Sequence, residues 1–172
     1  VNVRATTFGI AAGLGAIGAM EAYSNAGING VNDSLIAIKG KSQLISTRLN
    51  IVATIKSDLF AAASAGGGGG ISATGAVSGR TDLTTAAVRV EDGTIITSDT
   101  VSISARAERA VDGIANSLTF AVGSGSGASL DVKALGDALV EFYAHASDAS
   151  DASDAAARTV ITGRTIIIDT YN

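Results

Sequence analysis

Cysteine and proline are both absent from this 172-residue chain, and aromatic residues make up only 4% of it. Without cysteine there is no disulfide framework and no thiolate metal site. Hydrophobic residues still account for 47% of the sequence, so the core has to be built from small and β-branched side chains. Such a composition favours many thin, closely stacked layers over a globule organised around large aromatic side chains.

Charge is also sparse, with 12 Lys and Arg against 16 Asp and Glu and a formal net charge of −4. The basic residues are scattered along the chain, so the electrostatic footprint of a nucleic-acid-binding protein is missing. The one histidine, His145, stands beside a low-complexity run with no nucleophile elbow nearby. Neither a Ser–His–Asp triad nor a histidine zinc site is predicted.

What the sequence does contain is an internal repeat of about fifty residues. Three segments, 1–6, 49–54 and 101–106, align with apolar residues at every second position, which is the period of a β-strand. A strand, a glycine turn and a second strand precede the later two segments, and Asp92-Gly93 is the clearest turn dipeptide. The expected repeats are 1–48, 49–100 and 101–172, the last of them lengthened by an inserted loop at 144–157.

An uncharged stretch rich in Gly, Ala and Ser follows each alternating segment, at 5–20, 59–79 and 113–130. Each stretch is expected to form two strands joined by a bend of small residues. Their length approaches that of a membrane span, and residues 9–13 fit a GxxxG helix-packing pattern, so a membrane helix is the alternative. The five glycines at 66–70 disfavour it, since each costs about 1 kcal/mol in a helix relative to alanine. No membrane insertion is therefore expected.

These elements predict an all-β fold, a parallel β-helix or β-solenoid that runs as a single segment through residues 1–172. One repeat cannot bury its apolar face alone, whereas stacked repeats line a continuous narrow core. At about 20 to 25 residues per rung, the chain holds about seven or eight rungs. A β-sandwich or barrel is the alternative, but it leaves the matched turns unexplained. The first residues already look like a strand within a repeat, and no export signal precedes them, so the chain is expected to be a segment of a longer protein.

The run from Thr84 to Ala105 resembles the repeats of large bacterial filamentous adhesins, the leukotoxin-like and filamentous-haemagglutinin-type exoproteins. The resemblance lies in the Ala-Val-Arg-Val strand, the Asp-Gly turn, the Thr-Ile-Ile-Thr strand and the closing Val-Ser-Ile-Ser-Ala strand. The glycine run at 66–70 and the insertion at 144–157 depart from the family pattern. The resemblance implies a right-handed parallel β-helix, an extracellular location on the bacterial cell surface, and a role in cell adhesion, biofilm or fibre formation.

One group of residues is a candidate metal site. Asp148, Asp151 and Asp154 supply carboxylates, the ligand type that Ca²⁺ prefers, and their spacing of three can align them on one face of a helical turn. Neither an EF-hand loop nor a glycine-rich calcium repeat is present, so a solvated loop is the alternative interpretation. No cofactor and no cofactor-binding residue is predicted.

Polysaccharide-cleaving β-helices are the remaining enzyme class to weigh, and that comparison rests on fold analogy. The sequence shows no cluster of carboxylates with aromatic residues, and the glycines at 66–70 lack the Lys-Ser or Lys-Thr of a phosphate-binding loop. The chain is therefore expected not to be an enzyme. The carboxylates from which a cleaving pair would have to come are Glu91, Asp92, Asp99, Glu108, Asp112, Asp131, Asp137 and Glu141.

The sequence thus predicts a structural or adhesive segment of a secreted bacterial surface adhesin or extracellular fibre. Its expected partners are neighbouring solenoid segments or copies of itself placed end to end, together with host or cell-surface glycans or proteins. A second hypothesis is a subunit that polymerises into an extracellular filament, because an uncapped solenoid leaves strand edges open at both ends.

Overall fold

A computed structural model of the chain describes residues 2–27, 33–143 and 159–172, and every regular element in these ranges is a β-strand. The expected all-β class is confirmed. Within these ranges there is no helix of the length and hydrophobicity that crossing a membrane requires. The strands are β1 (Asn2–Ala26), β2 (Ser34–Ile38), β3 (Gln43–Asp82), β4 (Ala86–Glu91), β5 (Ile95–Ala134), β6 (Ala138–Tyr143), β7 (Val160–Thr162) and β8 (Thr165–Tyr171).

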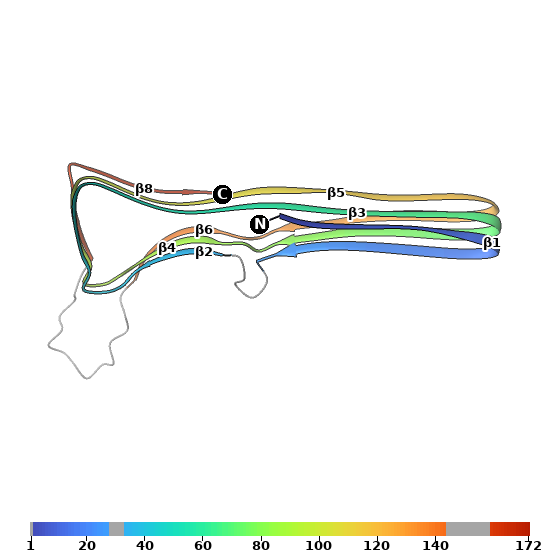
Figure 1. The fold of residues 1–172 in the computed structure, drawn as a ribbon, viewed down its shortest axis with the longest axis horizontal. Coiled ribbons are helices and arrows are strands. Elements are labelled where there is room, and N and C mark those ends of the chain that lie inside the picture. The colour runs from blue at the N-terminus through green and yellow to red at the C-terminus, as the bar shows by residue number, and fades with distance from the viewer. Residues whose placement is uncertain (1, 28–32, 144–158) are drawn as a thin grey trace, which may run out of the picture. The chain divides into compact units, whose positions relative to one another are not determined.

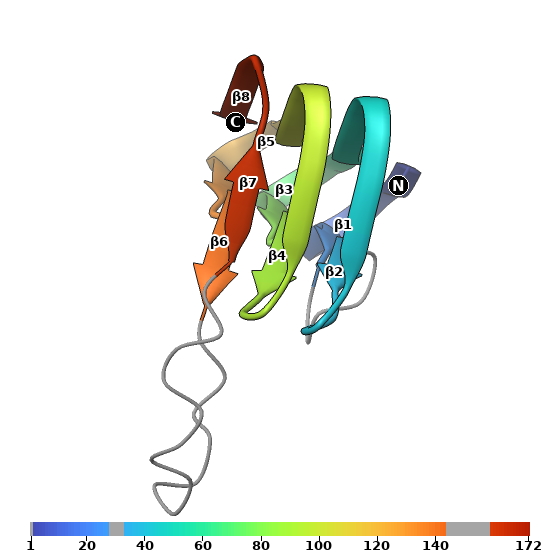
Figure 2. The ribbon, with the colours of Figure 1, turned by 90° about the vertical axis from the view of Figure 1, so that its left-hand side faces the viewer.

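Two sheets are formed. One has the order β1-β3-β5-β7, with β8 also paired to β5, and the other has the order β2-β4-β6. Figure 2 shows β2, β4 and β6 side by side, and their pairing is parallel, with Ser34 opposite Ala86 and Ala86 opposite Ala138. Side chains that bond across these pairs are 52 residues apart in sequence. The register therefore agrees with the predicted repeat of about fifty residues.

Strands β1, β3 and β5 are long, at 25, 40 and 40 residues, because each doubles back on itself inside its uncharged stretch (Figure 1). Gly69 shows why small residues are needed at such a bend. Its φ is 145°, and a Cβ atom there would fall 1.6 Å from the carbonyl oxygen of Gly13. No other residue type fits that position. The predicted pairs of strands joined by a small-residue bend are present.

Hydrogen-bonded partners lie farther apart in sequence than the rungs of about 20 to 25 residues that were expected. Asn2 pairs with Asp58, and Thr100 pairs with Thr165. The pairings of β1 with β3, of β2 with β4, of β4 with β6, and of β5 with β7 and β8 all join residues more than 50 positions apart, and they do not define a number of rungs. The physical reason is that one layer runs out and back along its uncharged stretch before the chain moves to the next layer.

One of the predicted alignments is wrong. Val3 pairs with Leu59, eight residues beyond its expected counterpart Ile51. Alternation alone does not determine the register, because a shift by an even number of residues keeps every side chain on the same face. By contrast, Ile51 and Ile103 both belong to one buried cluster, as their alignment predicted.

The chain divides into two compact units, each assembled from three separate stretches. Unit 1 consists of Val1–Val31, Ser57–Leu83 and Arg109–Leu135, and unit 2 of Asn32–Lys56, Thr84–Glu108 and Gly136–Asn172. The buried cluster of unit 1 contains only alanines: Ala22, Ala61, Ala63, Ala65 and Ala76. That of unit 2 is mostly larger and aliphatic: Ile51, Ala53, Ile55, Ala86, Val88, Val90, Ile96, Val101, Ile103, Ala105 and Ala107.

The turn predicted at Asp92-Gly93 is present. Gly93 has a φ of 72°, and the Thr94 hydroxyl donates a hydrogen bond of 2.7 Å to the Glu91 carbonyl oxygen. The equivalent position one repeat earlier is Lys41, which adopts a φ of 63° without being glycine.

Candidate functional site

The residues singled out for metal binding lie outside the described part of the chain. Asp148, Asp151 and Asp154 fall in the inserted loop, as does His145. Among the residues that the structure describes, no group of three or more acidic or histidine side chains comes together as a metal site would require. The calcium site therefore stays a prediction.

Three of the carboxylates that were weighed as glycosidase candidates bind basic side chains in unit 2. Lys39 Nζ lies 2.9 Å from Glu91 Oε1, and Arg89 Nε lies 2.7 Å from Glu141 Oε2. The third pair joins Lys56 to Glu108 at 2.6 Å. Each of these carboxylates is engaged by a basic side chain and joins segments that are distant in sequence.

The pKa of Glu108 is lowered in the folded chain. The hydrogen bond from Lys56 lowers the pKa of Glu108, and the charges of Lys56 and Arg106 act in the same direction, while desolvation opposes them. A general acid for glycoside cleavage needs a raised pKa instead. Glu108 is therefore unsuited to that role.

Arginine–aromatic contacts also connect register partners. The Arg4 guanidinium carbon lies 5.2 Å from the centre of the Phe60 ring, and Arg106 lies 5.5 Å from the Tyr171 ring. Both are directly opposite pairs, on β1–β3 and β5–β8. In each of these charged or aromatic pairs the basic residue precedes its partner in the sequence.

Unit 1 contains a buried polar cluster that the sequence analysis missed. Asp82 is fully buried, accepts a hydrogen bond from the Ser57 hydroxyl, and lies 3.7 Å from Arg109 Nε. The burial of Asp82 could have been predicted from the sequence, because even-numbered residues in the second half of β3, after its bend, face inward. An unpaired charge inside such a core would be strongly destabilising, so the partners are required.

Arg80, two residues earlier on the same inward face, is 1% exposed. Its Nη2 donates to the Ser78 hydroxyl at 2.9 Å and to the Ala61 carbonyl oxygen at 3.3 Å. Burial lowers the pKa of Arg80, and the Asp112 carboxylate opposes that shift. A Cβ atom on Gly113 would lie 1.3 Å from Arg80 Nη2, so this glycine provides the space for the guanidinium group.

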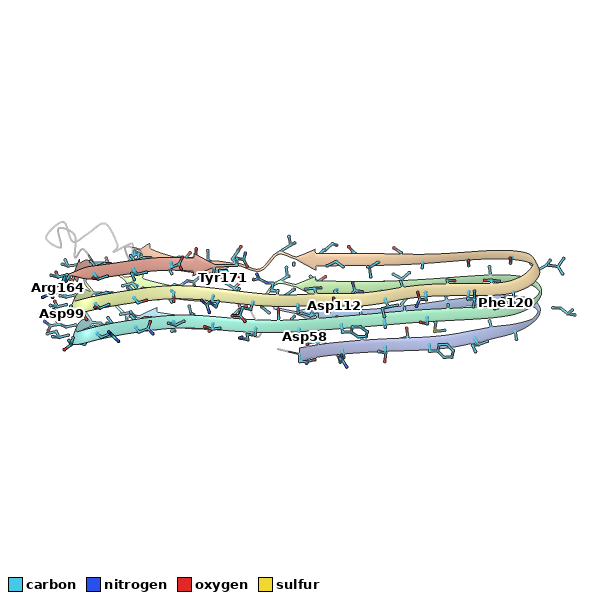
Figure 3. All side chains as sticks on the ribbon, turned by 90° about the horizontal axis from the view of Figure 1, so that it is seen from above. Asp58, Asp99, Asp112, Phe120, Arg164 and Tyr171 are labelled. Carbon is cyan, nitrogen blue, oxygen red and sulfur yellow. The ribbon has the colours of Figure 1, made fainter. Side chains whose placement is uncertain are left out.

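The outer face of unit 1 carries an apolar groove of about 670 Å³. Phe8 and Ile10 of β1 and Leu118 and Phe120 of β5 line it, and all four side chains are exposed. Figure 3 labels Phe120 near the bend of β5. The backbone of Gly66–Gly68 on β3 lies between these two groups of side chains. The complete lining is Phe8, Ile10, Ala12, Ser64, Ala65, Gly66, Gly67, Gly68, Asn116, Ser117, Leu118 and Phe120, and we refer to it as the glycine groove.

Glu91, Glu108 and Glu141 contact basic side chains, the buried charged residues Arg80 and Asp82 belong to unit 1, and the glycine groove is apolar with no charged residue in its lining. No protein-family model, curated protein sequence or solved structure matches the chain.

Proposed function

We propose that this chain is a structural and adhesive repeat segment of a secreted bacterial surface adhesin or extracellular fibre, folded as a β-solenoid. The observation that carries the proposal is the parallel, in-register stacking of β2, β4 and β6, whose partners recur after one repeat of 52 residues. Strands stacked in this way hydrogen-bond continuously along the stacking direction, which suits a stiff spacer.

Further support comes from how the charged residues are used. Salt bridges and arginine–aromatic contacts connect successive layers at matched positions. These contacts fix the register of neighbouring strands, and a stiff structural segment depends on a fixed register. The resemblance of residues 84–105 to filamentous adhesin repeats favours the cell surface as the location.

An adhesion assay tests this function. Beads coated with the purified chain should attach to epithelial cells or to a glycan-coated surface more strongly than beads coated with a β-solenoid enzyme of similar size. The folded chain should also resist trypsin. Equal attachment of both kinds of bead, together with rapid digestion, would contradict the proposal.

A second candidate, a subunit that polymerises end to end, is favoured by the exposed apolar residues of β8. Ile103 is fully buried, whereas Ile168, its register partner on β8, is 49% exposed. Among the described residues, β8 has β5 as its only paired strand, so its other edge is open. A further layer of the same pattern would cover both the apolar side chains and the edge.

Electron microscopy and light scattering of the isolated chain separate the two candidates. Filaments that lengthen with protein concentration support the self-polymerising subunit. Monomers at all concentrations support the segment of a longer shaft.

A further inference from the structure

Four of the five glycines at 66–70 on β3, Gly66 to Gly69, divide into two groups with different physical reasons. Gly67 and Gly69 are required by the fold. A Cβ atom on Gly67 would lie 2.4 Å from the Ser72 hydroxyl oxygen, and Gly69 has a φ of 145°. Packing and backbone conformation therefore explain these two positions.

A side chain at Gly66 or Gly68 would project from the other face of the strand. Neither a close contact nor a positive φ requires glycine at these two positions. A Cβ atom on Gly66 would meet its nearest neighbour, Ile10 Cγ1, at 3.5 Å, and one on Gly68 would meet the Phe120 carbonyl oxygen at 3.4 Å. These are ordinary contact distances, and neither residue has a positive φ. Glycine weakens a strand, and in a strand interior it often marks a bulge, a tight bend, or a place that a ligand or another backbone approaches closely.

Because Gly66 and Gly68 have no side chains, the backbone of β3 forms the floor of the glycine groove. Phe8 and Ile10 stand on one side of β3, and Leu118 and Phe120 stand on the other. The floor from Ser64 to Gly68 spans roughly 13 Å at about 3.3 Å per residue. A side chain at position 66 or 68 would fill this space.

The lining determines the chemistry of the occupant. No charged side chain lines the groove, so a ligand buried there is uncharged along its length. Strand β3 is already hydrogen-bonded to β1 and β5 on its two sides. An extended peptide or a sugar chain would therefore leave its own polar groups without backbone partners.

We infer that the glycine groove binds the hydrocarbon chain of a single-chain amphiphile with a neutral polar head group. The chain lies over Gly66 and Gly68 between the two groups of apolar side chains. The head group lies at the Ser64 end, where Asn116 supplies an amide and Ser64 a hydroxyl. This inference does not rest on the proposed surface-fibre function, and either can fail without the other.

Titration of the full chain with 1-monolauroylglycerol, below the concentration at which it forms micelles, tests the inference. Calorimetry should show saturable binding with one site per chain. Methyl signals of Ile10 and Leu118 should shift in the NMR spectrum, while those of Val88 and Val90 in the core of unit 2 should not.

Variants that fill the floor give the decisive comparison. Gly66→Val and Gly68→Val should each weaken binding about tenfold or more. Gly75→Val is the matched control, since Gly75 lies on the same strand outside the groove and a Cβ atom there meets nothing closer than 4.0 Å. It should leave the affinity unchanged.

Leu118→Asn provides a variant whose folding is not at risk, because Leu118 is 58% exposed. It should also weaken binding, with an unchanged melting temperature. Unchanged affinity in folded Gly66→Val and Leu118→Asn would overturn the inference. So would the absence of saturable binding to the wild type, or binding of an apolar peptide in place of the amphiphile.

Discussion

At the scale of single residues, charged side chains in this protein act mainly on neighbouring strands. Arg89 faces Glu141 directly across the β4–β6 pair, at a distance of 2.7 Å. Opposite charges at directly paired positions favour the native register, and a slip by two residues would break the contact. The contribution of each exposed pair to stability is small, but the pattern specifies one register among several that preserve alternation.

A double-mutant cycle on Arg89 and Glu141 measures this contribution. Arg89→Met, Glu141→Gln and the double variant should give a coupling free energy of about 0.2 to 1 kcal/mol in low salt. Urea denaturation at low salt and at 1 M NaCl provides the measurement. The coupling should largely vanish in high salt, because both side chains are substantially exposed. A coupling that salt does not change would contradict a surface ion pair.

Glu108 makes stability depend on pH in a defined direction. Its pKa is lowered in the folded chain, chiefly by the hydrogen bond from Lys56. Its stabilising effect should therefore be complete above the unfolded value of about 4.3 and disappear as pH falls through the lower folded pKa. Glu108→Gln should be less stable than the wild type at pH 7 and equal to it at the acid end. Denaturation curves from pH 7 to pH 3 test this, and a constant difference across that range would contradict it.

At the scale of the elements, turns and bends show where backbone geometry restricts the sequence. The turn after β4 places glycine at its left-handed position, Gly93, while the turn after β2 places Lys41 there. The two turns have the same shape, yet the lysine has a Cβ atom that this conformation disfavours. The repeat thus keeps the turn geometry without keeping the residue.

Exchanging these two residue types should have opposite effects on stability. Lys41→Gly should raise the free energy of unfolding by about 1 kcal/mol, because the strain exceeds the entropy that glycine adds to the unfolded chain. Gly93→Ala should lower it by about 1 kcal/mol or more. Thermal and urea denaturation of both variants provide the measurement. A loss of stability in Lys41→Gly would show that its side chain contributes more than its strain costs.

The close approach of the Arg80 guanidinium group to Gly113 should exclude a larger residue at position 113. Gly113→Ala should destabilise the chain by about 1 to 3 kcal/mol, because the new methyl group occupies the position of the buried guanidinium group. In an Arg80→Ala background the same substitution should cost little. The unfolding free energies of the wild type, the two single variants and the double variant test this. If Gly113→Ala destabilises the chain equally with and without Arg80, the two residues are not in contact.

Part of this organisation was predictable from sequence. Alternation and the Asp92-Gly93 turn indicated strands and their connection, because side-chain period and turn chemistry are local properties. The pairing of Val3 with Leu59 was not predicted, since alternation is unchanged by an even shift. The glycine groove was also missed. It depends on residues of three strands, which only the pairing of β3 with β1 and β5 brings together.

At the scale of the whole molecule, each compact unit combines three stretches that are distant in sequence. Neither unit can therefore form from one continuous segment, and each depends on the pairing of strands that are distant in sequence. The contacts of the β2-β4-β6 sheet and the salt bridges across it follow from this register. The proposed shaft function depends on it as well, because a slipped layer would interrupt the stacking.

Cysteine cross-linking between β2 and β4 tests this register most directly, and the chain has no cysteine of its own to interfere. Ala37 and Arg89 are exposed register partners, so their Cα atoms are close enough for a disulfide. Ala37→Cys with Arg89→Cys should form an intrachain disulfide under mild oxidation, detected by mass spectrometry after digestion. Ala37→Cys with Glu91→Cys, shifted by two residues, should keep free thiols. Free thiols in the first pair, or a disulfide in the second, would contradict the in-register stacking of β2 on β4.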